Sequence, residues 1–242
     1  MRFYGSGPVC GLLMLMGCVL CGCAEERAVL PVEQETATPL DVNALFARHQ
    51  EMHAVSGAFR DTVTRLDTTD EASNRLQVAF WLQRPDQYHF IVQENDSDDR
   101  QHYLSDGTSR WQVEVVLDNA IVDRQDADAD DPFARIQQLM HLDQEALAKD
   151  FQWAQVQAIA DLTPAAYAGV TFPESWAFAL VLQPYSPDMR SEVRSVLLAF
   201  SPAGDLLGLL IDDAHSNRRL VEIERLERHD ELDLAFFRWL EE

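Results

Sequence analysis

The spacing of apolar residues changes from helical to alternating near residue 58. Asp41 suits a helix N-cap, and the residues after it recur at helical spacing, which predicts an amphipathic helix over 41–53. Ser56-Gly57 is expected to break this helix. From Ala58 the period becomes two, which predicts that a strand begins there.

The next part of the chain predicts an antiparallel meander. Apolar residues alternate with polar ones in four runs, and short turns such as Arg84-Pro85 and Ser105-Asp106-Gly107 separate them. Strands joined by short turns pair antiparallel. The four expected strands are 76–82, 88–92, 102–104 and 111–115.

The second half repeats the order of helix and sheet. Pro132 stands where a helix can begin, and apolar residues at helical spacing predict one or two helices over 132–148. An α+β class follows, with an antiparallel sheet and helices on one side. Further strands are expected at 151–159, 176–183, 192–200, 206–213 and 220–226, with 232–239 ending the fold.

Composition and charge exclude several classes of protein. Hydrophobic residues make up 47% of the 242 residues, enough to bury a sizeable core. The formal net charge of −22 argues against nucleic acid as a partner and against spreading on anionic lipid, since both attract clustered Lys and Arg. The acidic balance favours solubility.

All four cysteines precede residue 24, so no disulfide framework is expected in the folded part. Arg2 followed by the apolar run 11–20 has the layout of a signal peptide. Leu20-Cys21-Gly22-Cys23 resembles a lipobox, in which the last Cys is acylated, with palmitate among its chains, and becomes the first mature residue. Cys18 is a weaker second candidate.

The expected organisation has three parts: a lipoprotein signal peptide at 1–22, a flexible tether with lipidated Cys23 at 23–40, and one globular domain at 41–242. Several acyl chains on Cys23 would hold the protein stably on a membrane. Ala24 after the Cys favours the periplasmic face of the outer membrane over the inner membrane.

Motifs for catalysis or metal binding are absent from the sequence. The acidic run at Asp126 starts like a calcium loop, but Asp131 and Gln137 occupy the positions that need Gly and Glu. His49 and His53 are four residues apart and are taken as surface histidines, since no third ligand is evident. No nucleophile elbow occurs. We therefore expect no enzyme activity, no metal and no cofactor.

Several motifs in order resemble the periplasmic lipoprotein carriers of the Lol system (LolA-like). They are Ser56-Gly57-Ala58-Phe59, the run 80–90 with Arg84-Pro85 at its centre, Leu104-Ser105-Asp106-Gly107 followed by Trp111, and Asp131-Pro132-Phe133. The resemblance implies a strongly curved antiparallel sheet, an incomplete β-barrel, closed by a helical lid over an apolar cavity for acyl chains. The related outer-membrane receptor (LolB-like) is lipidated, but its protruding apolar loop has no counterpart here.

The resemblance also implies ligand-binding residues. Arg84 corresponds to an arginine that bonds lid backbone carbonyls and holds the cavity shut, and a guanidinium with five donors suits this role. Tyr88 stands near the cavity mouth. The residues that correspond to apolar cavity or lid positions are Trp81, Phe90, Trp111, Phe133, Ile136 and Leu139. For each of them, an ordinary position in the hydrophobic core is the alternative.

The function so implied is a monomeric, membrane-anchored carrier or receptor for acylated lipoproteins or other lipids, acting in lipoprotein localisation. An envelope sensor or assembly scaffold of the same fold, binding a protein partner, is the alternative. A lipid hydrolase ranks third because no nucleophile–base pair is visible in the sequence.

Overall fold

The computed structural model describes residues 40–66, 74–95, 97–117, 119–126, 132–167 and 169–239, all within the compact unit Ala37–Glu242. The signal peptide, Cys23, the tether up to residue 39 and the acidic run 127–131 lie outside the described residues. Ala37–Glu242 contains a core of its own and all the strands of the sheet, as a domain that folds independently does.

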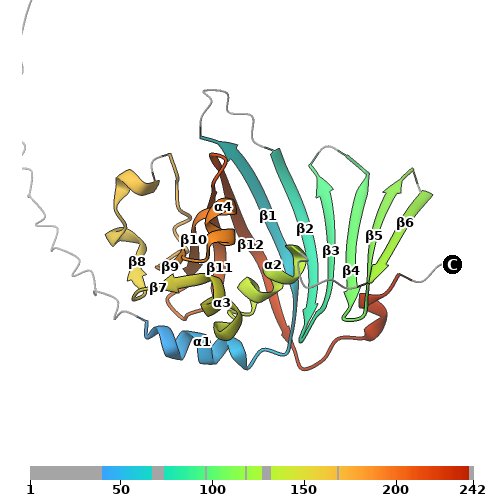
Figure 1. Ribbon diagram of the computed structural model, residues 1–242, viewed down its shortest axis with the longest axis horizontal. Coiled ribbons are helices and arrows are strands. Elements are labelled where there is room, and N and C mark those ends of the chain that lie inside the picture. The colour runs from blue at the N-terminus through green and yellow to red at the C-terminus, as the bar shows by residue number, and fades with distance from the viewer. Residues whose placement is uncertain are drawn as a thin grey trace, which may run out of the picture. The chain divides into compact units, whose positions relative to one another are not determined.

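Twelve antiparallel strands form one sheet (Figure 1). Its order is β6-β5-β4-β3-β2-β1-β12-β11-β10-β9-β7, with β8 also paired to β9. β6 and β7 stand at the two ends of this order, so the sheet is open. The strands are β1 (Ala54–Arg65), β2 (Asn74–Gln83), β3 (Gln87–Glu94), β4 (Arg100–Asp106), β5 (Ser109–Val116), β6 (Asn119–Asp126), β7 (Phe151–Trp153), β8 (Gln157–Ala158), β9 (Phe178–Pro184), β10 (Val193–Phe200), β11 (Leu206–Asp213) and β12 (Asn217–His229).

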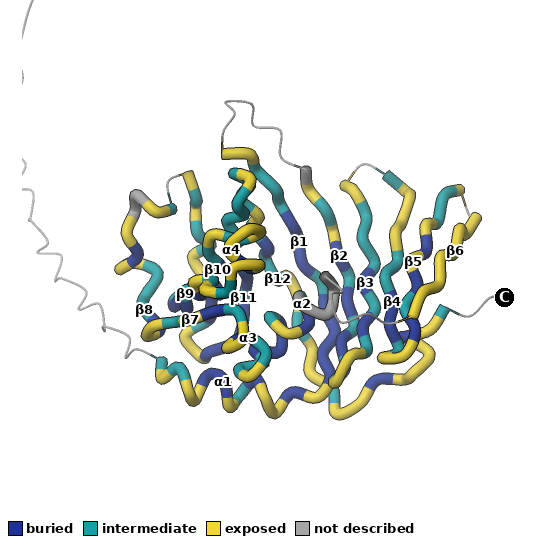
Figure 2. The backbone as a smooth tube through the Cα atoms, in the orientation of Figure 1, coloured by how far each residue is buried: buried dark blue, intermediate teal, exposed yellow. Residues whose placement is uncertain are grey.

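One face of the sheet surrounds the main core. Side chains from both halves of the sheet belong to the same buried cluster, such as Phe80 and Phe90 from β2 and β3 and Leu198 and Phe200 from β10. Because opposite halves share one core, the sheet curves around it, and Figure 2 shows buried residues on both sides of the helices. We call this face the inner face.

Helices pack against the inner face. α1 (Val42–Gln50) contributes Leu45 and Phe46 to the core, and α3 (Gln144–Asp150) contributes Leu147. The remaining helical segments are α2 (Pro132–Met140), α4 (Pro187–Glu192) and three short 3-10 turns, η1 (Ile159–Asp161), η2 (Pro164–Tyr167) and η3 (Leu234–Phe237). No helix among the described residues is long and apolar enough to span a membrane.

The α+β class and the antiparallel meander are confirmed, and the four expected strands fall within β2, β3, β4 and β5. The sequence did not predict β6, nor the short helix α4 before β10. Every residue of β6, an edge strand paired only with β5, is exposed, and a strand with no buried side carries no apolar alternation.

The expectation that Ser56-Gly57 ends the first helix is wrong. α1 ends at Gln50, and both residues lie inside β1. A Cβ on Gly57 would lie 2.1 Å from the backbone oxygen of Arg225 on β12 and 2.8 Å from the Phe80 ring. Glycine is therefore required here for the close approach of two strands, beside the bulge between Ala58 and Phe59.

We expect Gly57→Ala to lower the free energy of unfolding by about 3 kcal/mol, the upper end of the range for overpacking, because the added methyl meets backbone atoms. Gly107→Ala is the comparison. Gly107 has φ +86° in open space, so a side chain there costs only about 1 kcal/mol of backbone strain. Urea unfolding of both variants measures the losses, and an equal or smaller loss for Gly57→Ala would contradict the close approach.

Candidate functional site

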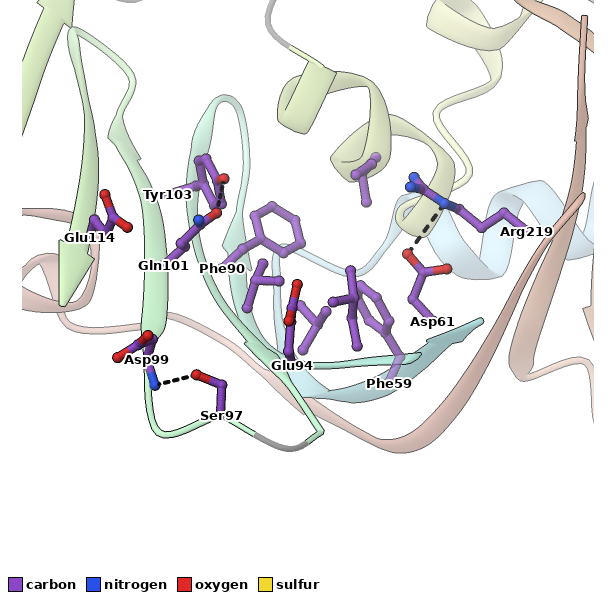
Figure 3. Close-up of a pocket in the computed structure, with 14 residues that line it drawn as sticks. Phe59, Asp61, Phe90, Glu94, Ser97, Asp99, Gln101, Tyr103, Glu114 and Arg219 are labelled. Atoms are coloured by element: carbon purple, nitrogen blue, oxygen red, sulfur yellow. Dashed lines mark hydrogen bonds and ion pairs between the residues drawn. The ribbon is translucent and has the colours of Figure 1, made fainter. Parts of the chain in front are cut away.

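A cavity of about 540 Å³ lies on the inner face, between the sheet and α2 (Figure 3). Strands β1 to β5 form its floor, and of the side chains that the structure describes on α2 and β12, Ile136 and Arg219 also line it. Its lining residues are Phe59, Asp61, Leu76, Val78, Phe90, Val92, Glu94, Ser97, Asp99, Gln101, Tyr103, Glu114, Ile136 and Arg219.

The cavity floor changes from apolar to polar across the sheet. In one cross-strand row, Phe59, Val78 and Val92 are direct neighbours on β1, β2 and β3. The same row continues with Gln101 on β4 and Glu114 on β5. Alternate residues of a strand share a face, so this pattern follows from the register and gives a cavity with one apolar side and one polar side.

Asp61 is a buried carboxylate within the cavity wall. It is 6% exposed, and its Oδ1 atom has no hydrogen-bond partner. Its Oδ2 atom lies 3.3 Å from Nε of Arg219, whose side chain is 47% exposed. Burial raises the pKa of the Asp61 carboxyl, and the charge of Arg219 opposes this shift.

Three further carboxylates stand around the cavity on β3, β5 and the β3–β4 turn: Glu94, Glu114 and Asp99. All three residues are exposed. Nearby, the Tyr103 hydroxyl donates to Oε1 of Gln101 at 2.6 Å. The cavity is thus lined by four carboxylates, Asp61 included, and one arginine among its described residues.

Hydrogen bonds join the C-terminal half of α2 to the β2–β3 turn. The Gln137 amide, 3% exposed, donates to the backbone oxygens of Gln83 at 3.0 Å and Gln87 at 3.3 Å. Arg84 donates from Nη2 to the backbone oxygen of His141 at 3.1 Å, and its buried Nε has no hydrogen-bond partner. α2 is therefore held over the cavity by a few polar contacts at one end.

His141 follows α2 and is buried beside Arg84. Desolvation and the nearby Arg84 charge lower the pKa of His141 to about 4. Its Nδ1 lies 3.1 Å from the Gln137 backbone oxygen, to which the neutral ring donates. At neutral pH the histidine is therefore an uncharged part of the α2 attachment.

Two of the ligand-binding residues expected from the sequence, Phe90 and Ile136, line the cavity. Tyr88 is buried in the main core, and Leu139 packs against that core. Arg84 bonds the backbone after α2, as described above. Phe133 belongs to α2, but its side chain lies outside the described residues.

Trp81 and Trp111 were expected at the cavity, but they lie on the opposite, outer face. Trp81 stacks on Phe236 with ring centroids 5.7 Å apart. Trp111 packs with Leu104 and Val113. Side chains alternate along a strand, so Trp81 points away from the face of its neighbour Phe80, and Trp111 lies on the face opposite to Glu114, three positions along β5.

The polar residues of the cavity were missed by the sequence reading. Only Asp61 carries a local signal, a charged residue two positions from Phe59 on the same side of a strand. His49 also differs from expectation. It is fully buried, and its Nε2 lies 3.1 Å from the Gly204 backbone oxygen, so it is no surface histidine. Within the described residues no group of three potential ligands could hold a metal ion.

Acid should destabilise the domain through His141. Its pKa in the folded state, about 4, is below that of the unfolded chain, about 6.5, so the unfolded state takes up the proton first as pH falls. Stability is expected to fall from about pH 6.5 to about pH 4. Urea unfolding over this range should show a shallower loss for His141→Gln than for wild type. His53→Gln, at an exposed position, is the matched control, and identical curves for wild type and His141→Gln would contradict the assignment.

No protein-family model matches the sequence, and no curated protein matches it. Similar solved structures include a LolA superfamily protein from Nitrosomonas europaea, 12% identical, with a TM-score of 0.40 over 83% of this chain and 98% of that one. A DUF1329 family protein from Desulfovibrio piger is 8% identical, with a TM-score of 0.37 over 81% and 95%. A β-barrel-like DUF1849 protein from Brucella abortus is 11% identical, with a TM-score of 0.32 over 74% and 99%.

At this level of similarity, the function has to be inferred from the residues of the chain itself.

Proposed function

We propose that the protein binds the acyl chains of lipoproteins or other lipids in the inner-face cavity. In this proposal Cys23 anchors it to the periplasmic face of the outer membrane, where it acts in lipoprotein localisation. The observation that carries the proposal is the cavity itself. Its volume of about 540 Å³ falls in the range of about 300–1,000 Å³ typical of small-molecule sites, and its floor on β1 to β3 is largely apolar.

Transfer of an acyl chain requires a cover that opens. We assign this role to α2 and α3, called the lid below, because Ile136 of α2 reaches the cavity while Met140 and Leu147 pack in the main core. The polar contacts that the structure describes between α2 and the β2–β3 turn come from residues 137–141. Each such bond contributes about 0.5–1.5 kcal/mol, or about 1.5–3 kcal/mol where a charged group donates, so these polar contacts oppose opening of the lid only modestly.

Arg84 serves as the latch in this scheme, since its guanidinium reaches the lid backbone at His141. Binding and release depend on differential affinity for the acyl chain, and the proposal needs neither a catalytic group nor a cofactor. The acyl chain enters the apolar side of the cavity between Val78 and Ile136.

One observation favours a second candidate, a scaffold or sensor that binds a protein partner. Edge strand β6 is exposed along its whole length, with Ile121 65% exposed, and Leu117 beside it is 86% exposed. Such an edge can accept a strand from another chain. A native pull-down that yields a stoichiometric protein and no extractable lipid would favour this candidate over the carrier.

Filling the cavity should abolish lipid uptake. Val92→Trp places a large ring on the cavity floor, whereas Val122→Trp places the same ring on exposed β6. The unit Ala37–Glu242 carrying Val92→Trp is expected to lose at least about tenfold in affinity for a fluorescent fatty acid, about 1.4 kcal/mol of binding free energy. Fluorescence titration gives the affinities and thermal unfolding confirms the fold. Unchanged uptake by Val92→Trp would refute binding in this cavity.

Weakening the lid attachment should be visible by hydrogen exchange. Gln137→Ala removes both bonds to the β2–β3 turn and should lower lid stability by about 1–3 kcal/mol, because two backbone oxygens lose their amide donor. Amide protons of α2 are expected to exchange faster in this variant, while those of β2 keep their rate. Gln138→Ala, one residue away and exposed, is the matched control. Equal exchange in the two variants would argue against the attachment.

A further inference from the structure

We propose that the cavity selects amphiphiles whose polar end is a protonated amine, and that Asp61 is the residue that receives this amine. The inference rests on the proposed function, since it assumes that the apolar tail of the ligand occupies the cavity. It goes further in naming the head group. An ammonium group is distinguished by its charge and its three hydrogen-bond donors from the carboxylate of a fatty acid and the phosphate of a phospholipid.

The first step is the unsatisfied oxygen of Asp61. A buried carboxylate oxygen without a hydrogen-bond donor is costly, because the group has lost its water and gained nothing in return. Asp61 is more than nine-tenths buried, lines the cavity, and leaves Oδ1 without a partner (Figure 3). Oδ1 itself has almost no accessible surface, so a donor carried by a ligand in the cavity would satisfy this atom after a small rotation of the Asp61 side chain.

The second step is the charge around the cavity. Asp99 and Glu114 lie on the side opposite Arg219 in Figure 3, Glu94 lies between them and Asp61, and none of the three forms an ion pair with Arg219. A cationic head group is attracted by all four carboxylates, whereas an anionic one is repelled by them and is attracted only by Arg219. Burial favours the uncharged form of Asp61 in the empty cavity, and a bound cation would favour the carboxylate.

The third step is the weak hold that Arg219 has on Asp61. Nε of Arg219 lies 3.3 Å from Oδ2 of Asp61, and nearly half of the Arg219 side chain is exposed. A short bidentate ion pair between two buried side chains would be hard to replace. Here the distance is long and the Arg219 side chain is half exposed. An ammonium group can therefore approach Asp61 beside Arg219 or take its place.

The fourth step is the position of Asp61 relative to the apolar floor. Asp61 follows Phe59 on the same side of β1, and its cross-strand neighbour on β2 is Leu76. A ligand whose head group binds Asp61 thus has apolar side chains beside the first carbons of its tail. Head-group and tail sites are continuous, as an amphiphile requires.

The test compares three ligands that share a sixteen-carbon chain and differ only in the head group: hexadecylamine, hexadecanol and palmitate. Each displaces a fluorescent apolar dye from the unit Ala37–Glu242 at neutral pH, below the concentration at which it aggregates. Hexadecylamine is protonated under these conditions, as an alkyl amine is. It is expected to bind at least about tenfold more tightly than palmitate, with hexadecanol between them.

Variants assign the preference to Asp61. Asp61→Asn should lower the affinity for hexadecylamine about tenfold and leave the affinity for hexadecanol unchanged, because residue 61 loses its charge and keeps its shape. Arg219→Gln should raise the affinity for hexadecylamine, because it removes the cation that competes for Asp61. This second variant also tests the proposal if Asp61→Asn does not fold. Asp86→Asn, at an exposed turn outside the cavity, is the control and should bind as wild type does.

The outcomes separate the two proposals. If none of the three ligands displaces the dye, binding in the cavity is refuted and the amine preference falls with it. If hexadecanol and palmitate bind as tightly as hexadecylamine, the amine preference is overturned while lipid binding stands. Tight hexadecylamine binding that survives both Asp61→Asn and Arg219→Gln unchanged would also overturn the role of Asp61.

Discussion

The pairing of β1 with β12 is the interaction on which the rest of the structure depends. It runs from Ala54 opposite His229 to Arg65 opposite Asn217, and it joins the two halves of the sheet. Without it, the meander β2–β6 and the strands β9–β11 would share no core. The same pairing, called the β1–β12 seam here, also completes the candidate site, because Asp61 belongs to β1 and Arg219 to β12. Gly57 makes this seam possible by leaving room for the backbone of β12.

Local patterns explain why the meander was predictable. Apolar and polar residues alternate in β2 and β3 because the inner side of each strand is buried. The hairpin β10–β11 has turn residues between its two strands. The face on which each aromatic residue lies was not predictable, because both faces of this sheet are partly covered. Phe236 and Phe237 of η3 and the following Trp239 pack on the outer face, where they meet Trp81 and the Trp111 cluster. An aromatic residue on a strand was therefore no sign of the cavity.

The polar residues of the candidate site could not be predicted from the sequence for a different reason. The chain has 41 acidic residues, and only its surroundings in the fold distinguish a carboxylate in a binding site from one on the surface. Asp61 is distinguished by burial and by a partner on β12, more than 150 positions along the chain. Arg84 is the opposite case. It lies in a short turn whose motif identifies it, even though its contact, the backbone oxygen of His141, lies 57 positions along the chain.

The open ends of the sheet have a mechanical consequence. In a closed barrel, strand number and stagger fix the radius, so the interior cannot widen without breaking ladder hydrogen bonds. In this chain β6 and β7 are not paired to each other, and the sheet can flatten or tighten by small changes in twist between neighbouring strands. The width of the cavity is thereby adjustable through the coiling of the sheet, so in the proposed carrier the same set of hydrogen bonds would enclose acyl chains of different thickness or number.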